Sequence, residues 1–480
     1  MPSLVAFEFK KIVARRVTHM ATLGLFVLLV LIMALNIAQQ TATDAAGDVV
    51  SGPAAIALEK ERAEAHAGAV TEERATEAIR AYQALLAAAE DAEAGDAEAA
   101  GDAGAGAADA TTDGSADAEA AGGEAAASGT AGASAAGAPA DAATNDDAPT
   151  GATANAPAGT PDPTAGASAA QELLAYEADN TAYLGLVMRP WMTGYEFVDS
   201  VAPRIDASGT VPLYAQVAAS VEAEVEGSPG TWEYTPAERE YWLQKYADTE
   251  KPAVYGYAGG WTDILSCIDF LFLAIVAACV AAAPVFAGEY QERTVGVILA
   301  TRHGKGRLVA AKLAASFLFS TCVYALFAAV VVGIPLAFFG ADGAQLPLQG
   351  QRLSIPYSAT MAQAVGICLG IGWAITLGMT AFALLLSARL RSQLAIFASC
   401  IAVVMLPLFL PTLPSSLANH ALQLLPLNGL NYVNLFSEYV SYAAGPVVLD
   451  LQSALVAAYA VVTALAVPLA ARAFRRHQVQ

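Results

Sequence analysis

The sequence predicts an all-α polytopic membrane protein with six transmembrane helices, an amphipathic N-terminal helix, and a large, mainly helical extracellular insertion between helices 1 and 2. A mean hydropathy of +0.47 with only 14% charged residues is typical of a membrane protein. Six apolar stretches are each long enough to cross ~30 Å of hydrocarbon, which takes about 20 helical residues. Basic residues gather on one side of these stretches, which predicts the orientation of the chain.

The apolar stretches define the order of segments along the chain. The predicted spans are residues 20–39, 264–287, 308–340, 359–387, 394–413 and 449–471. The predicted inner segments are residues 1–19, 288–307, 388–393 and 472–480. The predicted outer segments are residues 40–263, 341–358 and 414–448. The last of these outer segments is apolar in patches, but it is too short and broken to cross the bilayer.

The basic residues place both termini in the cytoplasm. Fourteen of the 24 Lys and Arg residues fall in or beside the inner segments, whereas the short outer loops hold one, Arg352. The other nine lie within residues 40–263, a region long enough to translocate largely regardless of its charge. The inner residues are Lys10, Lys11, Arg15, Arg16, Arg293, Arg302, Lys305, Arg307, Lys312, Arg389, Arg391, Arg472, Arg475 and Arg476.

Residues 3–16 have the pattern of an amphipathic helix lying in the membrane interface. Its apolar side holds Leu4, Phe7, Ile12 and Val13. The alternative is a basic flank that only orients the first span. A cleaved signal peptide is a further alternative, but residues 20–38 exceed the usual apolar core of about 7–15 residues, which favours retention as the first span.

The outer segment 40–263 divides by composition. Residues 53–92 predict two outer helices. Residues 93–169 contain almost nothing to bury and predict a disordered insert. No Lys or Arg occurs between Arg80 and Arg189, so much of the net charge of −21 lies here, and an acidic outer region argues against nucleic-acid binding. Thr235 and Glu238 form a capping box that begins a further helix.

The chain shows no motif for catalysis, cofactor binding or metal binding. No GxxxxGK[ST] loop is present, the five histidines are isolated, and the five cysteines lie in predicted spans. We therefore predict no enzymatic activity. Asp269 is the clear ionisable residue within a predicted span, about 8 Å from its outer start at ~1.5 Å per residue. It is a candidate for lining a translocation path, with snorkelling to water as the alternative.

The inner segment after the second span has the pattern of a docking surface. Glu289 and Glu292 precede a basic stretch, and the apolar run 295–299 predicts a short helix packed against something. The order Glu289…Thr294…Leu299-Ala-Thr-Arg-His-Gly-Lys-Gly-Arg…Lys312 resembles the loop after the second span of ABC-2 type permeases, especially the variant of Gram-positive bacteria. His303 stands at the usual aromatic position, and Arg293 stands where many members have Gly.

This resemblance implies the membrane subunit of an ABC transporter, more often an exporter, in the plasma membrane. It implies a separate ATP-binding subunit, a second permease copy or paralogue, an elbow helix within residues 1–19, and short re-entrant helices within 414–448. The implied ATPase-coupling residues are Glu289, Glu292, Arg293, Thr294, Val297, Ile298 and Leu299. The alternatives are a membrane receptor or scaffold that uses the outer domain, and an integral-membrane enzyme.

Overall fold

The computed structural model describes residues 2–44, 48–105, 163–194, 196–292, 306–410, 412–445 and 447–476. Residues Met1–Leu86 and Glu172–Gln480 form one compact unit, and Ala87–Gln171 form a second. Within the described residues the second unit holds the end of helix α4 (Glu72–Ala105) and the beginning of helix α5 (Pro163–Met188). The rest of the fold belongs to the first unit.

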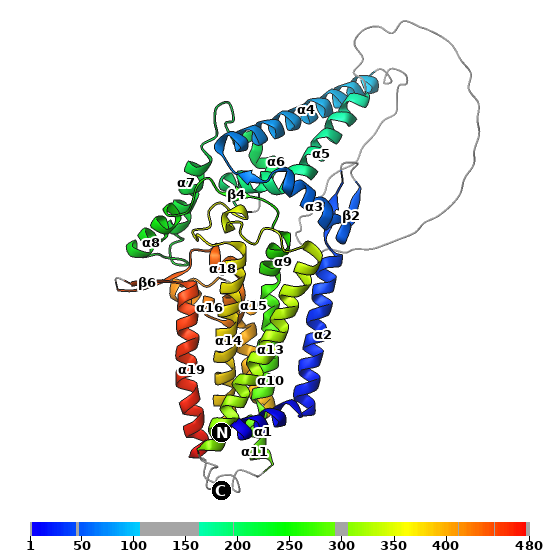
Figure 1. Cartoon of the computed structure of the whole chain (residues 1–480). Helices are drawn as coiled ribbons and strands as arrows, with labels where there is room; N and C mark the ends of the chain where they lie inside the picture. Colours follow the sequence, from blue (N-terminus) through cyan, green and yellow to red (C-terminus); the bar gives the residue numbers. More distant parts are fainter. Residues whose placement is uncertain are drawn as a thin grey trace, which may run out of the picture. The chain divides into compact units, whose positions relative to one another are not determined.

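A bundle of apolar helices is the centre of the first unit (Figure 1). Helix α14 packs against α10, α13 and α19, and α2 packs against α10 and α13. The bundle consists of α2 (Arg16–Ala38), α9 (Gly259–Cys267), η3 (Ile268–Leu271), α10 (Phe272–Ala282), α11 (Pro284–Gln291), α13 (Arg307–Phe339), α14 (Met361–Arg389), α15 (Gln393–Phe409) and α19 (Leu451–Arg475).

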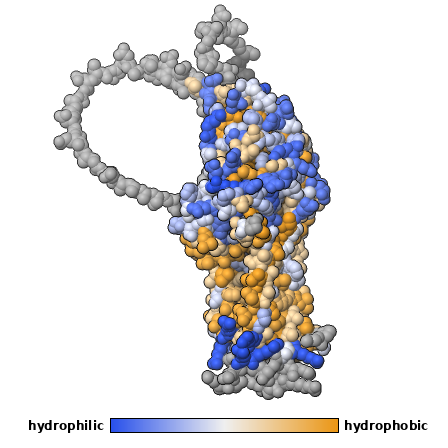
Figure 2. Space-filling view, turned by 90° about the vertical axis from the view of Figure 1, so that its left-hand side faces the viewer, coloured by the Kyte–Doolittle hydropathy of each residue, from blue (hydrophilic) through white to orange (hydrophobic). Residues whose placement is uncertain are grey.

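Five helices of the described chain are long and apolar enough to cross a membrane: α2, the run Gly259–Gln291, α13, α14 and α19. On the face drawn in Figure 2, apolar side chains form a band along these helices, with polar surface above and below it. The protein is therefore a mostly helical, polytopic membrane protein. The predicted span 394–413 differs, because α15 has 17 residues and ends at Phe409. At ~1.5 Å per residue it measures about 26 Å, so the six-span count stays a prediction.

A close contact in the bundle joins α14 to α19 at a glycine. A Cβ added at Gly378 would collide with the ring of Tyr459, whereas a Cβ added at Gly370 of the same helix meets nothing within 4 Å. Small residues let membrane helices approach closely, because packing rather than hydrophobic burial holds them together.

We expect Gly378→Ala to destabilise the bundle by about 1–3 kcal/mol, the usual effect of overpacking a filled core. Gly370→Ala, which adds the same methyl group to the same helix, is expected to leave the protein as stable as the wild type. The measurement is the thermal unfolding midpoint of the detergent-solubilised protein. Equal midpoints for the two variants would contradict the close α14–α19 packing.

The part of the first unit beyond the bundle, which we call the outer region after its predicted placement, is mainly helical. Its further helices are α3 (Pro53–Ala65), η1 (Arg189–Trp191), α6 (Val198–Val201), η2 (Ala202–Arg204), α7 (Leu213–Glu226) and α8 (Pro236–Ala247), with η4 (Leu348–Gly350) between α13 and α14. Strands β1 (Thr41–Thr43) and β2 (Val49–Ser51) pair antiparallel as neighbours in the sequence. Strands β3 (Gly68–Ala69) and β4 (Val254–Tyr255) also pair antiparallel and join distant parts of this region.

The predicted outer elements are present, with longer helices than expected. Helices α3 and α4 confirm the two helices of residues 53–92, and the capping box is made, with Glu238 N donating to Thr235 Oγ1 at 3.3 Å. Helix α4 continues to Ala105 and α5 begins at Pro163, so both edges of the predicted insert 93–169 are helical. The middle of that insert, residues 106–162, lies outside the described residues.

The segment between α15 and α19 contains short helices, as expected, and a hairpin that was not expected. Helix α17 packs against α10, α14 and α15, and a Cβ at Gly429 would lie 2.9 Å from Leu455 Cδ2. The elements are α16 (Ser416–Gln423), α17 (Pro426–Leu430), α18 (Tyr432–Phe436), β5 (Ser441–Ala444) and β6 (Val447–Asp450). Because β6 runs to Asp450, helix α19 begins at Leu451 rather than at residue 449.

The hairpin β5–β6 receives helix α8 of the outer region. Lys245 Nζ lies 2.8 Å from Asp450 Oδ2 and 3.7 Å from the centre of the Tyr357 ring. Trp242 Nε1 donates to Ser441 Oγ at 3.1 Å. Asp450 also caps α19, since its Oδ1 accepts from Ser453 N at 3.1 Å. The ion pair therefore fixes α8 to the start of α19, the indole hydrogen bond fixes it to β5, and the cation–π contact fixes it to the segment before α14.

Candidate functional site

Three helices meet at the end of the bundle that is opposite the outer region (Figure 1). They are α1 (Pro2–Val13), α11 and the first turns of α13. Helix α1 packs along α13, and Ile12 is buried in the core, whereas Phe7 is 63% exposed. The packed face of α1 therefore differs from the predicted apolar side, because it also contains the buried Glu8.

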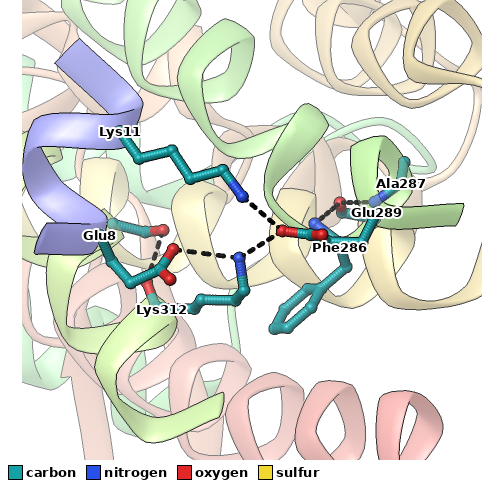
Figure 3. A network of polar contacts seen from close by, with 8 residues as sticks. Glu8, Lys11, Phe286, Ala287, Glu289 and Lys312 are labelled. Carbon is teal, nitrogen blue, oxygen red and sulfur yellow. Dashed lines mark hydrogen bonds and ion pairs between the residues drawn. The ribbon is translucent and has the colours of Figure 1, made fainter. Parts of the chain in front are cut away.

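Charges of alternating sign, three of them buried and that of Lys11 half-buried, connect these helices (Figure 3). Lys312 Nζ lies 3.0 Å from Glu8 Oε2 and 2.9 Å from Glu289 Oε1. Lys11 Nζ lies 2.6 Å from the same Glu289 oxygen. Lys312 is only 2% exposed, so this ammonium group has left water and depends on its two carboxylates for compensation. We call these four residues the ion cluster.

Arg15 adds a third positive charge beside the ion cluster. A Cβ on Gly288 would lie 3.5 Å from Arg15 Nη2, which places the guanidinium against helix α11. Burial lowers the pKa of Arg15, and the charges of Glu289, Glu292 and Glu8 oppose that shift. Arg15 Nη1 is buried, and no hydrogen-bond partner for it occurs in the part of the chain that the structure describes.

The position of Glu289 depends on a break in the second span. Pro284 has no N–H, so α11 begins as a separate helix after α10. Ser387 of α14 bridges the break: its Oγ accepts from Phe286 N at 3.0 Å and from Ala287 N at 3.1 Å, and it donates to Ala283 O at 2.7 Å. One hydroxyl thus satisfies backbone groups that the break would leave unpaired, and it fixes α11 against α14.

The predicted coupling residues fall into two groups. Glu289 lies in the ion cluster, and Glu292 is exposed at the end of α11. The other five lie outside the described residues: Arg293, Thr294, Val297, Ile298 and Leu299. The sequence analysis did not predict the pairing of Glu8, Lys11 and Lys312. Lys312 lies within the predicted span 308–340, and an ionisable residue at such a position was the available signal.

Asp269 lies where the second span meets the short helices of segment 414–448. Its Oδ2 accepts from Asn431 Nδ2 at 2.9 Å. Its Oδ1 is buried and has no hydrogen-bond partner among the residues described. Asn431 also caps α18, because its Oδ1 accepts from Asn434 N at 3.1 Å. This arrangement places a carboxylate inside the bundle at the short helices of segment 414–448. A role for Asp269 in translocation stays a prediction.

Comparison with known proteins gives one match. A family model described as ABC-2 family transporter protein matches residues 3–477. No curated protein and no solved structure matches the chain. The match includes α1, the bundle and the outer region, so it extends over all three helices that form the ion cluster.

Proposed function

Because the chain belongs to the ABC-2 family of transporter proteins, we propose that it is a permease that exports its substrate and is driven by a separate ATP-binding subunit. The ion cluster is the observation that supports this most strongly. Glu289 and Lys312 lie 2.9 Å apart, so an ion pair joins the two described helices that precede and follow residues 293–305 in the chain. A force applied to the segment would reach α1, α11 and α13 together.

We further propose that residues 293–305 form the docking site for the ATPase. Their sequence holds the apolar residues Val297, Ile298 and Leu299, with Arg293 and Thr294 before them. Apolar anchors surrounded by charges are typical of protein interfaces that bind tightly. The adjoining Glu289 is held by two ammonium groups, so a movement of the docked partner would shift a connected set of helices.

The proposed arrangement in the membrane has six spans, with α15 as the short fifth one, and both termini in the cytoplasm. Two permeases, either identical or paralogous, would form one path with two ATPases. Helix α1 would be the elbow helix, since it lies beside α2 and exposes Phe7. An exposed aromatic side chain on such a helix suits the membrane interface.

The orientation is tested by cysteine labelling in intact cells. We expect a membrane-impermeant maleimide to label Ser208→Cys, which is exposed in the outer region, and to leave Ser392→Cys at the start of α15 unlabelled. The wild type, with its five native cysteines, gives the background. Labelling at position 392 but not at position 208 would reverse the proposed orientation.

The function is tested by purification from native membranes. An ABC-type ATPase should co-purify with the tagged chain, and adding the purified permease in lipid nanodiscs should raise the ATP hydrolysis rate of that ATPase. A receptor or scaffold that works through its outer region predicts neither result. Recovery of the chain without any ATPase, and with no change in hydrolysis on mixing, would contradict the proposal.

A further inference from the structure

A cavity of about 650 Å³ lies between the outer region and the outer ends of α2 and α9. Its volume is within the range of about 300–1,000 Å³ that is typical of small-molecule sites. Its wall includes Asn36 of α2, Glu59 and Arg62 of α3, Tyr183 of α5, and Asp263 of α9. These residues come from four separate helices, so the cavity forms only when the outer region folds onto the bundle.

The cavity wall contains buried polar atoms that have only a weak hydrogen-bond partner, or none among the described residues. The Asp263 side chain lines the cavity, although the residue is only 7% exposed, and its hydrogen-bond donor is the Cys267 thiol at 4.0 Å, a weak one. Asn36 Oδ1 and the Tyr183 hydroxyl are buried, and the described residues offer neither of them a hydrogen bond. Burying such groups unpaired costs stability, which a ligand that supplies hydrogen-bond donors would restore.

The charges of the side chains in the cavity wall determine whether the ligand is a cation or an anion. Three carboxylates line the cavity, those of Glu59, Asp179 and Asp263, against one guanidinium, that of Arg62. The Arg62 group is already engaged, because its Nε donates to Asp179 at 2.8 Å and its Nη2 donates to Thr43 O at 2.6 Å. The negative charge of Asp263 therefore has no cation beside it in the wall. A cationic ligand fits this site, and an anionic one does not.

The aromatic side chains of the cavity wall and its unpaired hydrogen-bond acceptors limit which cationic ligands fit. Tyr183, Tyr255 and Tyr257 present aromatic surface to the cavity, which attracts cations and accommodates an apolar body. Burial, helped by the nearby charge of Arg74, lowers the pKa of His66, which favours a neutral imidazole in the wall near pH 7. Asp263 and Asn36 present acceptors that need hydrogen-bond donors, and among cations a primary ammonium group has N–H donors whereas a quaternary one lacks them.

We propose that this cavity binds an amphiphilic primary amine, with the ammonium group at Asp263 and Asn36 and the apolar body against the tyrosine rings. The proposal goes beyond the transport function, since binding here requires neither an ATPase nor transport. The ammonium group supplies the hydrogen bonds that Asp263 and Asn36 lack, and it balances the Asp263 charge.

The test uses dansylcadaverine, a fluorescent primary amine with an aromatic body, and the protein in phosphatidylcholine nanodiscs without ATPase. Saturable fluorescence enhancement is expected with the wild type, after subtraction of the signal from empty nanodiscs. Asp263→Asn should weaken binding about tenfold or more, the effect of losing one charge-assisted hydrogen bond. The matched control is Asp248→Asn, which removes the same charge from an exposed position outside the cavity wall.

A second variant keeps the proposal testable if Asp263→Asn does not fold. Asn36→Leu replaces the amide, whose Oδ1 has no partner among the described residues, with an apolar side chain of similar size, so it should keep the wild-type unfolding temperature and still weaken binding severalfold. The alcohol and the carboxylate that correspond to dansylcadaverine should bind at least about tenfold more weakly than the amine. Three results would overturn the proposal. They are equal binding of the amine and the alcohol, unchanged binding by Asp263→Asn, and no saturable binding to the wild type up to about 1 mM, which corresponds to a binding free energy of roughly −4 kcal/mol.

Discussion

Replacing Lys312 with Met is expected to lower the free energy of unfolding by about 3–5 kcal/mol, the effect of leaving a buried charge without its partner. Lys312 Nζ lies within 3.0 Å of both Glu8 and Glu289, and all three residues are buried. Methionine keeps the approximate length and the apolar stem of the lysine side chain. The decrease in the free energy of unfolding therefore reports the removal of the charge alone. Thermal unfolding of the solubilised protein, together with its yield in the membrane fraction, measures the effect.

Two further variants make this result specific. Lys60→Met removes the same charge from an exposed pair, where Lys60 Nζ lies 2.7 Å from Asp342 Oδ2, and it should change stability little. Glu289 keeps its ion pair with Lys11 in the Lys312→Met variant, so the carboxylate that loses its ammonium partner is Glu8. Adding Glu8→Gln to Lys312→Met removes that charge and should recover part of the loss, which is the signature of a direct interaction. If Lys312→Met and Lys60→Met unfold at the same temperature, the ion cluster does not hold α1 to the bundle.

The second large effect is expected at residues 298 and 299. Changing both Ile298 and Leu299 to Asp should abolish ATPase association while the protein still reaches the membrane. Two carboxylates cannot enter an apolar groove without losing their hydration, so docking at this place would fail completely. Co-purification of the ATPase with the tagged variant measures the loss.

The control adds the same two charges elsewhere. Ser208→Asp with Thr210→Asp changes two exposed positions of the outer region and should leave ATPase association intact. A segment held only by lipid headgroups predicts that the ATPase still co-purifies with the 298/299 variant at normal yield. That outcome would show that residues 293–305 are not the main docking site, and it would weaken the proposed function.

Local patterns in the sequence were sufficient for most of the helices. The predicted spans 308–340 and 359–387 differ from α13 and α14 by at most two residues at either end, because continuous apolar runs mark such helices. The capping box at Thr235 and Glu238 could also be predicted from the sequence, since its two members are three residues apart. Apolar length alone failed for residues 394–413, where helix α15 ends at Phe409, two residues after Pro407.

Contacts between distant residues were beyond these patterns. Glu8 and Lys312 are 304 positions apart. Lys312 stands out as an ionisable residue within the predicted span 308–340, but nothing in either segment identifies Glu8 as its partner. The contact between Asp269 and Asn431 spans 162 positions, so sequence identified the carboxylate but not its partner. The hairpin β5–β6 was missed because its apolar residues resemble those of the neighbouring short helices. Only tertiary packing decides between the two structures at that position.

Helix α8 is a site where a bound reagent would be attached rigidly to the membrane helices. Lys245 and Trp242 join it to Asp450 and Ser441, and Asp450 is itself the first capping residue of α19. An antibody fragment that recognises the exposed side of α8, where Leu243 is 37% exposed, would therefore be attached rigidly to a transmembrane helix. Its position in electron micrographs would report the tilt of α19 and serve as a fiducial for aligning images of a particle whose own features are buried in detergent.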